Sequence, residues 1–126
     1  MSDTPLKRIV IAEDDPAIAG MLLKVLSQFY DVTVTNDGAS AVAAASKQPP
    51  PDLLLLDVMM PAMDGHAVAA AIRALPGLKS IPIIFLTAKT GPAEVIKGIQ
   101  SGARHYLTKP FKIDDLVQKV KKAIGG

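Results

Sequence analysis

Several short apolar segments of this sequence end in polar or charged residues that could take part in chemistry. These residues are Glu13 and Asp14, Asp57, Thr87, and Lys109. Each one alone is explained as well by a helix cap or a surface side chain. Short apolar runs closed by turn residues are typical of buried strands, and parallel strands bring their carboxyl ends to one edge of a sheet. Together, the five residues would place three carboxylates, a hydroxyl and an ammonium group at that edge.

Three neighbouring carboxylates indicate a metal-assisted reaction. Glu13, Asp14 and Asp57 cannot all stay ionised cheaply without a counter-charge. Mg²⁺ binds carboxylates together with water and phosphate oxygens, and Mg²⁺ with Lys109 would balance the three negative charges. Phosphoryl transfer uses such a set, with Asp57 as the nucleophile and the Thr87 hydroxyl as a hydrogen-bond donor.

The segments that must position these residues alternate between strand and helix patterns. The stretch LLLLDVMMPAMDG holds Asp57 at the end of the leucine run Leu53–Leu56, which is typical of a strand buried on both faces. Asp15 before Pro16 is a helix-start signal. The predicted strands are Lys7–Ala12, Asp31–Thr35, Asp52–Asp57, Ile81–Thr87 and Arg104–Thr108. The predicted helices cover about 16–29, 39–47, 67–75, a segment from Pro92 to before Gly102, and 113–124.

This alternation predicts an α/β fold, a doubly wound five-stranded parallel sheet flanked by five helices. The 126 residues suit a single domain, and a net charge of +2 is too small to indicate a nucleic-acid surface. The absence of cysteine excludes disulfides and thiolate metal sites and fits a cytoplasmic protein. No apolar run is long enough to cross a membrane.

With these features the chain resembles the receiver domains of two-component response regulators, which have the CheY-like variant of the flavodoxin-like fold. The matching pieces are Glu13-Asp14, the stretch around Asp57, Thr87-Ala88 and Lys109-Pro110-Phe111. The resemblance covers about residues 7–124 and treats residues 1–126 as one receiver domain. It implies the strand order 2-1-3-4-5 that is known for CheY.

The resemblance also implies roles around a divalent cation, Mg²⁺ or Mn²⁺. Asp57 is the phosphoacceptor, and Asp14 is a direct metal ligand. Glu13 acts on the metal largely through water, and Met59 lends its backbone carbonyl.

A further group is implied to contact the phosphoryl group and to respond to it. Thr87 and Lys109 contact phosphoryl oxygens, and small Ala88 leaves room beside them and offers a backbone N–H. Tyr106 resembles the switch aromatic that moves inward as Thr87 swings toward the phosphate. The alternative, a half-buried strand tyrosine with its hydroxyl in water, is itself compatible with switching. The Lys109–Pro110 peptide bond is expected to be cis.

The implied function is a signalling switch whose own chemistry is limited to Mg²⁺-dependent self-phosphorylation and self-dephosphorylation. The donor is a histidine kinase or a phosphotransferase. The downstream target is a protein that binds the face made by the fourth helix, fifth strand and fifth helix. Basic residues on that face suit an acidic partner, although a solvated face is the alternative; no nucleic acid or membrane contact and no output domain are expected. The basic residues are Lys89, Lys97, Arg104, Lys112, Lys119 and Lys122.

Two other classes of protein share parts of this pattern. Phosphatases that form an aspartyl phosphate place a second aspartate two residues after the nucleophile, where this chain has Met59. They also carry a substrate-selecting cap, for which a chain of this length lacks room. In a flavodoxin-like electron carrier, the acids Glu13-Asp14-Asp15 would repel the phosphate of FMN. We interpret His66 and His105 as surface residues, which argues against a histidine-ligated metal.

Overall fold

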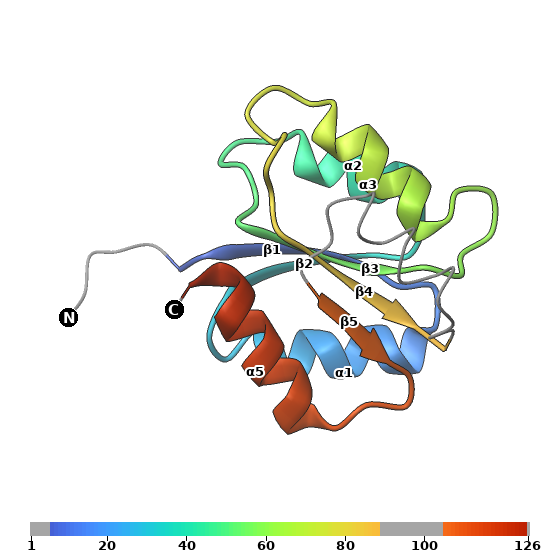
Figure 1. The fold of residues 1–126 in the computed structure, drawn as a ribbon, viewed down its shortest axis with the longest axis vertical. Coiled ribbons are helices and arrows are strands. Elements are labelled where there is room, and N and C mark those ends of the chain that lie inside the picture. The colour runs from blue at the N-terminus through green and yellow to red at the C-terminus, as the bar shows by residue number, and fades with distance from the viewer. Residues whose placement is uncertain (1–5, 89–104, 126) are drawn as a thin grey trace.

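The computed structural model describes residues 6–88 and 105–125, in which five strands form one sheet between two layers of helices (Figure 1). The strands are β1 Arg8–Ala12, β2 Asp31–Thr35, β3 Leu53–Asp57, β4 Ile83–Thr87 and β5 His105–Thr108. The helices are α1 Pro16–Leu26, α2 Gly38–Ala45, α3 Gly65–Arg73 and α5 Ile113–Ile124. The helix expected after Pro92 falls outside the described residues.

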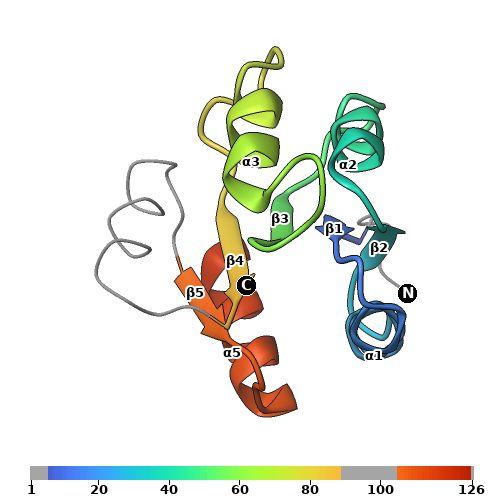
Figure 2. The same cartoon turned by 90° about the vertical axis from the view of Figure 1, so that its right-hand side faces the viewer.

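All neighbouring strands are parallel, and their order is β2-β1-β3-β4-β5, which confirms the predicted topology. Helices α2 and α3 cover one face of the sheet, while α1 and α5 cover the other (Figure 2). Strand β3 occupies the centre, paired with β1 on one side and β4 on the other. The carboxyl ends of β1, β3, β4 and β5 therefore meet at one edge of the sheet.

The leucine run of β3 explains why both faces of the sheet are covered. Side chains alternate along a strand, so Leu53 and Leu55 pack with α1 and α5, whereas Leu54 and Leu56 pack with α2 and α3. All four leucines are fully buried. Burying apolar surface on both faces stabilises the central strand, which carries Asp57 at its end.

Aspartates begin three of the described helices. Asp15 accepts hydrogen bonds from the backbone N–H groups of Ala17 and Ile18 and stands before Pro16, so the predicted N-cap is confirmed. Asp37 caps α2 and Asp64 caps α3 in the same way.

Two predictions about the first and third helices were wrong in detail. Helix α1 ends at Leu26, so Phe29 lies beyond the helical stripe to which it was assigned and is 47% exposed. Tyr30 takes the buried position there instead. Helix α3 begins at Gly65, directly after its cap, and not at Ala67.

None of the helices within the described ranges combines the length and apolar character that crossing a membrane requires.

Candidate functional site

The residues singled out in the sequence lie at the carboxyl-end edge of the sheet. Glu13 follows β1, Asp57 and Thr87 are the last residues of β3 and β4, and Lys109 follows β5. Glu13, Asp57 and Thr87 are buried, and burial is unusual for acids such as Glu13 and Asp57.

Lys109 joins two of the buried acids. Its Nζ lies 2.7 Å from Glu13 Oε1 and 3.1 Å from Asp57 Oδ2. The backbone N–H of Lys109 donates to the Thr87 carbonyl at 2.9 Å, so the lysine is anchored to the end of β4. The Lys109–Pro110 bond is cis, as predicted. A single cation thus offsets part of the negative charge of two carboxylates.

Glu13, Asp14 and Asp57 together form a possible metal site. Each offers a carboxylate oxygen, and these oxygens all lie within 4.8 Å of one another. An open cleft of about 500 Å³ borders all three and is also lined by Met59, Ala88 and Lys109. The ligand atoms that these three residues offer are all carboxylate oxygens, and Asp14 is exposed to the cleft, so the donor set fits a hard cation such as Mg²⁺.

Burial and charge crowding change the acid–base properties of the site. Burial raises the pKa of Glu13 to about 7, and the neighbouring Asp57 carboxylate adds to this shift. The contacts with Lys109 and with the Asp15 N–H lower the pKa of Glu13 and offset part of the rise. Burial lowers the pKa of Lys109, but its contacts with Glu13 and Asp57 outweigh this and raise the pKa overall. The lysine therefore stays protonated between its two partners.

The loop after β3 holds the Asp57 carboxylate in place. The Met59 N–H donates to Asp57 Oδ1 at 3.1 Å, and the Met59 side chain is 55% exposed. The Val58 N–H donates to the Leu86 carbonyl at 2.9 Å, and the Val58 carbonyl accepts from Gly65 N–H at 3.0 Å. Because β3, β4 and the start of α3 are joined here, the carboxylate has little freedom to turn away.

Gly65 lies against the backbone of Asp57. A Cβ atom at position 65 would be 2.5 Å from the Asp57 carbonyl oxygen, which is closer than Cβ contacts occur. In the Asp64-Gly65 pair, the aspartate therefore caps helix α3, and the glycine allows the close approach to the Asp57 backbone.

His66, like Phe29, is a residue that the sequence interpretation placed wrongly. It is not on the surface: its exposure is 9%, and its ring centroid lies 4.5 Å from that of Phe85. The signal in the sequence was its place three residues before Ala69, on the buried side of α3. The side chain of His105 falls outside the description. Tyr106 is half-buried on β5, away from the cleft, with its ring centroid 5.7 Å from that of Phe85.

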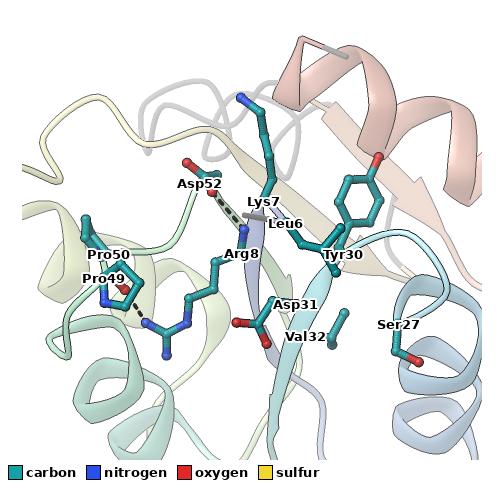
Figure 3. A pocket seen from close by; sticks show the side chains of 10 residues that line it. All are labelled: Leu6, Lys7, Arg8, Ser27, Tyr30, Asp31, Val32, Pro49, Pro50 and Asp52. Carbon is teal, nitrogen blue, oxygen red and sulfur yellow. Dashed lines mark hydrogen bonds between the residues drawn. The ribbon is translucent and has the colours of Figure 1, made fainter. Parts of the chain in front are cut away.

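A second, larger cavity of about 820 Å³ lies at the opposite edge of the sheet, where the strands begin (Figure 3). Two of its charged side chains, Arg8 and Asp52, contact backbone groups. The Arg8 guanidinium donates to the Pro49 carbonyl, and the Arg8 N–H donates to Asp52 Oδ2 at 2.7 Å. Among the described residues, the cluster of three acids lies at the other edge.

Comparison with known proteins agrees with this arrangement. The model of the response regulator receiver domain family matches residues 9–121. The DNA-binding response regulator MtrA of Mycolicibacterium smegmatis is 43% identical over 120 residues, which are 94% of this chain and 51% of MtrA. The chain thus spans about half the length of this curated relative.

Solved structures give the same result. The chemotaxis protein CheY4 of Vibrio cholerae has a TM-score of 0.89 at 30% identity, covering 94% of this chain and 98% of CheY4. The receiver domain of the sensor histidine kinase PA1611 from Pseudomonas aeruginosa carries a magnesium ion in its active-site cleft. It has a TM-score of 0.85 at 33% identity, covering 98% of this chain and 100% of that domain. The chain belongs to the response regulator receiver domain family, the phosphoaccepting signalling domains of two-component systems.

Proposed function

We propose that Asp57 is the phosphoacceptor of this receiver domain. The observation that carries the proposal is the contact of Lys109 Nζ with both Glu13 and Asp57 at the end of the buried central strand. Asp57 is the carboxylate that both this lysine and the Met59 N–H touch, so its two oxygens are held for attack from a fixed position.

Glu13, Asp14 and Asp57 hold a divalent cation, Mg²⁺ or Mn²⁺, with the Met59 carbonyl as a further ligand. The cation supplies positive charge that neutralises phosphoryl oxygens during transfer. Asp14 is the direct ligand, because it is exposed to the cleft and has no lysine partner among the described residues. Glu13 is already engaged with Lys109 and with the Asp15 N–H, which suits a ligand acting through water.

In the transfer step an Asp57 oxygen attacks the phosphorus atom of the donor. A phosphorus–oxygen bond forms while the bond from phosphorus to the donor breaks, and the donor atom leaves with the bonding electron pair. The Lys109 ammonium and the Thr87 hydroxyl stabilise the phosphoryl oxygens, and small Ala88 leaves room and offers its N–H. Attack of water on the phosphorus returns free Asp57 and inorganic phosphate. These two reactions are the whole of its chemistry.

The physiological donor is a histidine kinase or a phosphotransferase, and the protein acts in the cytoplasm. Residues 1–126 form one receiver domain whose core covers about residues 7–124. Phosphorylation moves Thr87 and Tyr106, and the response leaves through the face made by the fourth helix, β5 and α5. The target is a protein with an acidic surface; no direct contact with nucleic acid or membrane is part of this function.

The test is phosphoryl uptake from acetyl phosphate in the presence of Mg²⁺, followed by intact-mass measurement. The wild-type protein gains one phosphoryl group, which hydroxylamine removes because an aspartyl phosphate is a mixed anhydride. Asp57→Asn keeps the shape of the side chain but lacks the nucleophilic carboxylate, so it gains none. A hydroxylamine-sensitive adduct of equal yield on Asp57→Asn would show that another residue is the acceptor.

A further inference from the structure

Three rings stand in a row on the α3 side of the sheet. The ring centroids of His66 and Phe85 are 4.5 Å apart, and those of Phe85 and Tyr106 are 5.7 Å apart. Phe85 on β4 and Tyr106 on β5 are direct partners in the register of the two strands. Phe85 is fully buried, so its ring is confined between its two aromatic neighbours and the core beneath α3.

One end of this row is tied to the acceptor strand. His66 follows Gly65, whose N–H donates to the Val58 carbonyl at 3.0 Å and whose α-carbon has no room for a side chain beside Asp57. The hydrogen bond and the close approach of Gly65 couple the first turn of α3 to the segment Asp57–Val58. A movement at the carboxyl end of β3 can therefore reach His66 through its neighbour Gly65.

We propose that His66 is a positioning residue for Tyr106. Its ring fixes one side of Phe85, and the Phe85 ring sets how far Tyr106 can move inward. Changes at Asp57 then reach Tyr106 by a second route, through Gly65, His66 and Phe85, in addition to the route through Thr87. The inference rests on the proposed function only in that it makes Tyr106 the group that responds to phosphorylation.

Truncating the ring has a defined physical effect. His66→Ala leaves space beside Phe85, and buried neighbours move partly into such a space. Phe85 then tilts toward α3, and Tyr106 follows it inward without any phosphoryl group. His66→Phe keeps an aromatic ring against Phe85 and preserves the row. A positioning role thus predicts that the aromatic replacement rescues what the alanine variant changes.

Tyrosine fluorescence measures the position of Tyr106 directly. The chain has no tryptophan and two tyrosines, so in Tyr30→Phe the fluorescence comes from Tyr106, apart from weak phenylalanine emission. In this background, acrylamide quenching is measured for the free protein and with Mg²⁺ and beryllofluoride. Leu26→Ala, at a fully buried position on the opposite face of the sheet, serves as the control for loss of core packing. Melting temperatures are recorded for all variants, and phosphoryl uptake is measured separately by mass.

The expected result is that His66→Ala lowers the quenching constant of the free protein and abolishes its further fall with beryllofluoride. His66→Phe and Leu26→Ala behave as the background protein. Unchanged quenching in His66→Ala, or an equal change in Leu26→Ala, would overturn the inference. The free-protein measurement decides this even if no phosphoryl uptake is found, because failed uptake contradicts the proposed function and leaves the quenching comparison intact.

Discussion

Lys109 lies between two buried carboxylates, so its removal has opposite effects on two properties of the protein. Lys109→Ala leaves Glu13 and Asp57 without that cation, which should preserve or strengthen Mg²⁺ binding. It also removes an ammonium group from the phosphoryl oxygens and should slow phosphorylation by about 100-fold, as loss of one stabilising donor does elsewhere. Stopped-flow phosphorylation and calorimetry measure the two effects. Lys112→Ala, which changes an exposed lysine near the start of α5, is the control. Wild-type phosphorylation kinetics in Lys109→Ala would contradict the assigned role.

The two acids after β1 should contribute unequally to metal affinity. Asp14→Ala is expected to weaken Mg²⁺ binding by at least about tenfold, or about 1.4 kcal/mol, and by more than Glu13→Ala. Glu13 is buried and already paired with Lys109, whereas Asp14 faces the cleft. Titration calorimetry is run at pH 8, above the raised pKa of Glu13 of about 7, so that Glu13 is largely ionised.

Removing one of three mutually repelling carboxylates should also raise the melting temperature of the metal-free protein. Asp31→Ala, at an exposed position at the start of β2, is the matched control for loss of an acid. Equal Mg²⁺ affinity in the wild type and Asp14→Ala would show that Asp14 is not a direct ligand.

At the scale of elements, the junction between β3 and α3 depends on a missing side chain. In Gly65→Ala the new Cβ meets the Asp57 carbonyl oxygen at 2.5 Å, so α3 or the end of β3 must move. We expect a loss of about 1–3 kcal/mol in the free energy of unfolding and slower phosphorylation. Gly20→Ala in α1 is the control, because nothing lies within 4 Å of its Cβ position and alanine favours a helix. Urea unfolding measures the free energy of unfolding of Gly65→Ala and Gly20→Ala. Equal values for the two variants would mean that the junction between β3 and α3 adapts freely.

The elements could be predicted from the sequence where a local pattern decides them. The leucine run of β3 and the Asp15-Pro16 start of α1 are such patterns, and the structure has both. Contacts between distant residues left no local pattern. His66 is buried because Phe85, nineteen positions later, packs on its ring, and a polar residue type suggested the surface.

The candidate site shows the same division. Convergence of Glu13, Asp57 and Lys109 followed from parallel strands, because each residue stands at a strand end. The contact of Lys109 with Glu13 at 2.7 Å could not be predicted in this way, because the lysine was expected to contact the phosphoryl group. Which carboxylate a lysine contacts depends on side-chain geometry that the sequence pattern does not encode.

For the whole molecule, phosphorylation should change the surface far from the cleft. Adding beryllofluoride and Mg²⁺ is expected to shift amide resonances at Tyr106 and along α5. Lys112, just before α5, and Lys122 on it are exposed. Of the other basic residues assigned to this face, Lys119 is half-buried on α5, while Lys89, Lys97 and Arg104 fall outside the described residues. Two-dimensional NMR of the free and activated protein provides the measurement. Shifts confined to the loops around Asp57 would contradict an output through this face.

The direction of α5 has a practical consequence. The strands all end at the edge that holds Asp57, and α5 runs back from that edge, so its C-terminal end lies toward the edge where the strands begin (Figure 1). A fluorescent protein fused after Gly125 would therefore leave the cleft accessible to a phosphodonor. A second fluorophore placed near Asp57 would report, by energy transfer, on its distance from the first across the length of the sheet. If Asp57 is the phosphoacceptor, the domain is thus a scaffold for a sensor of its own phosphorylation.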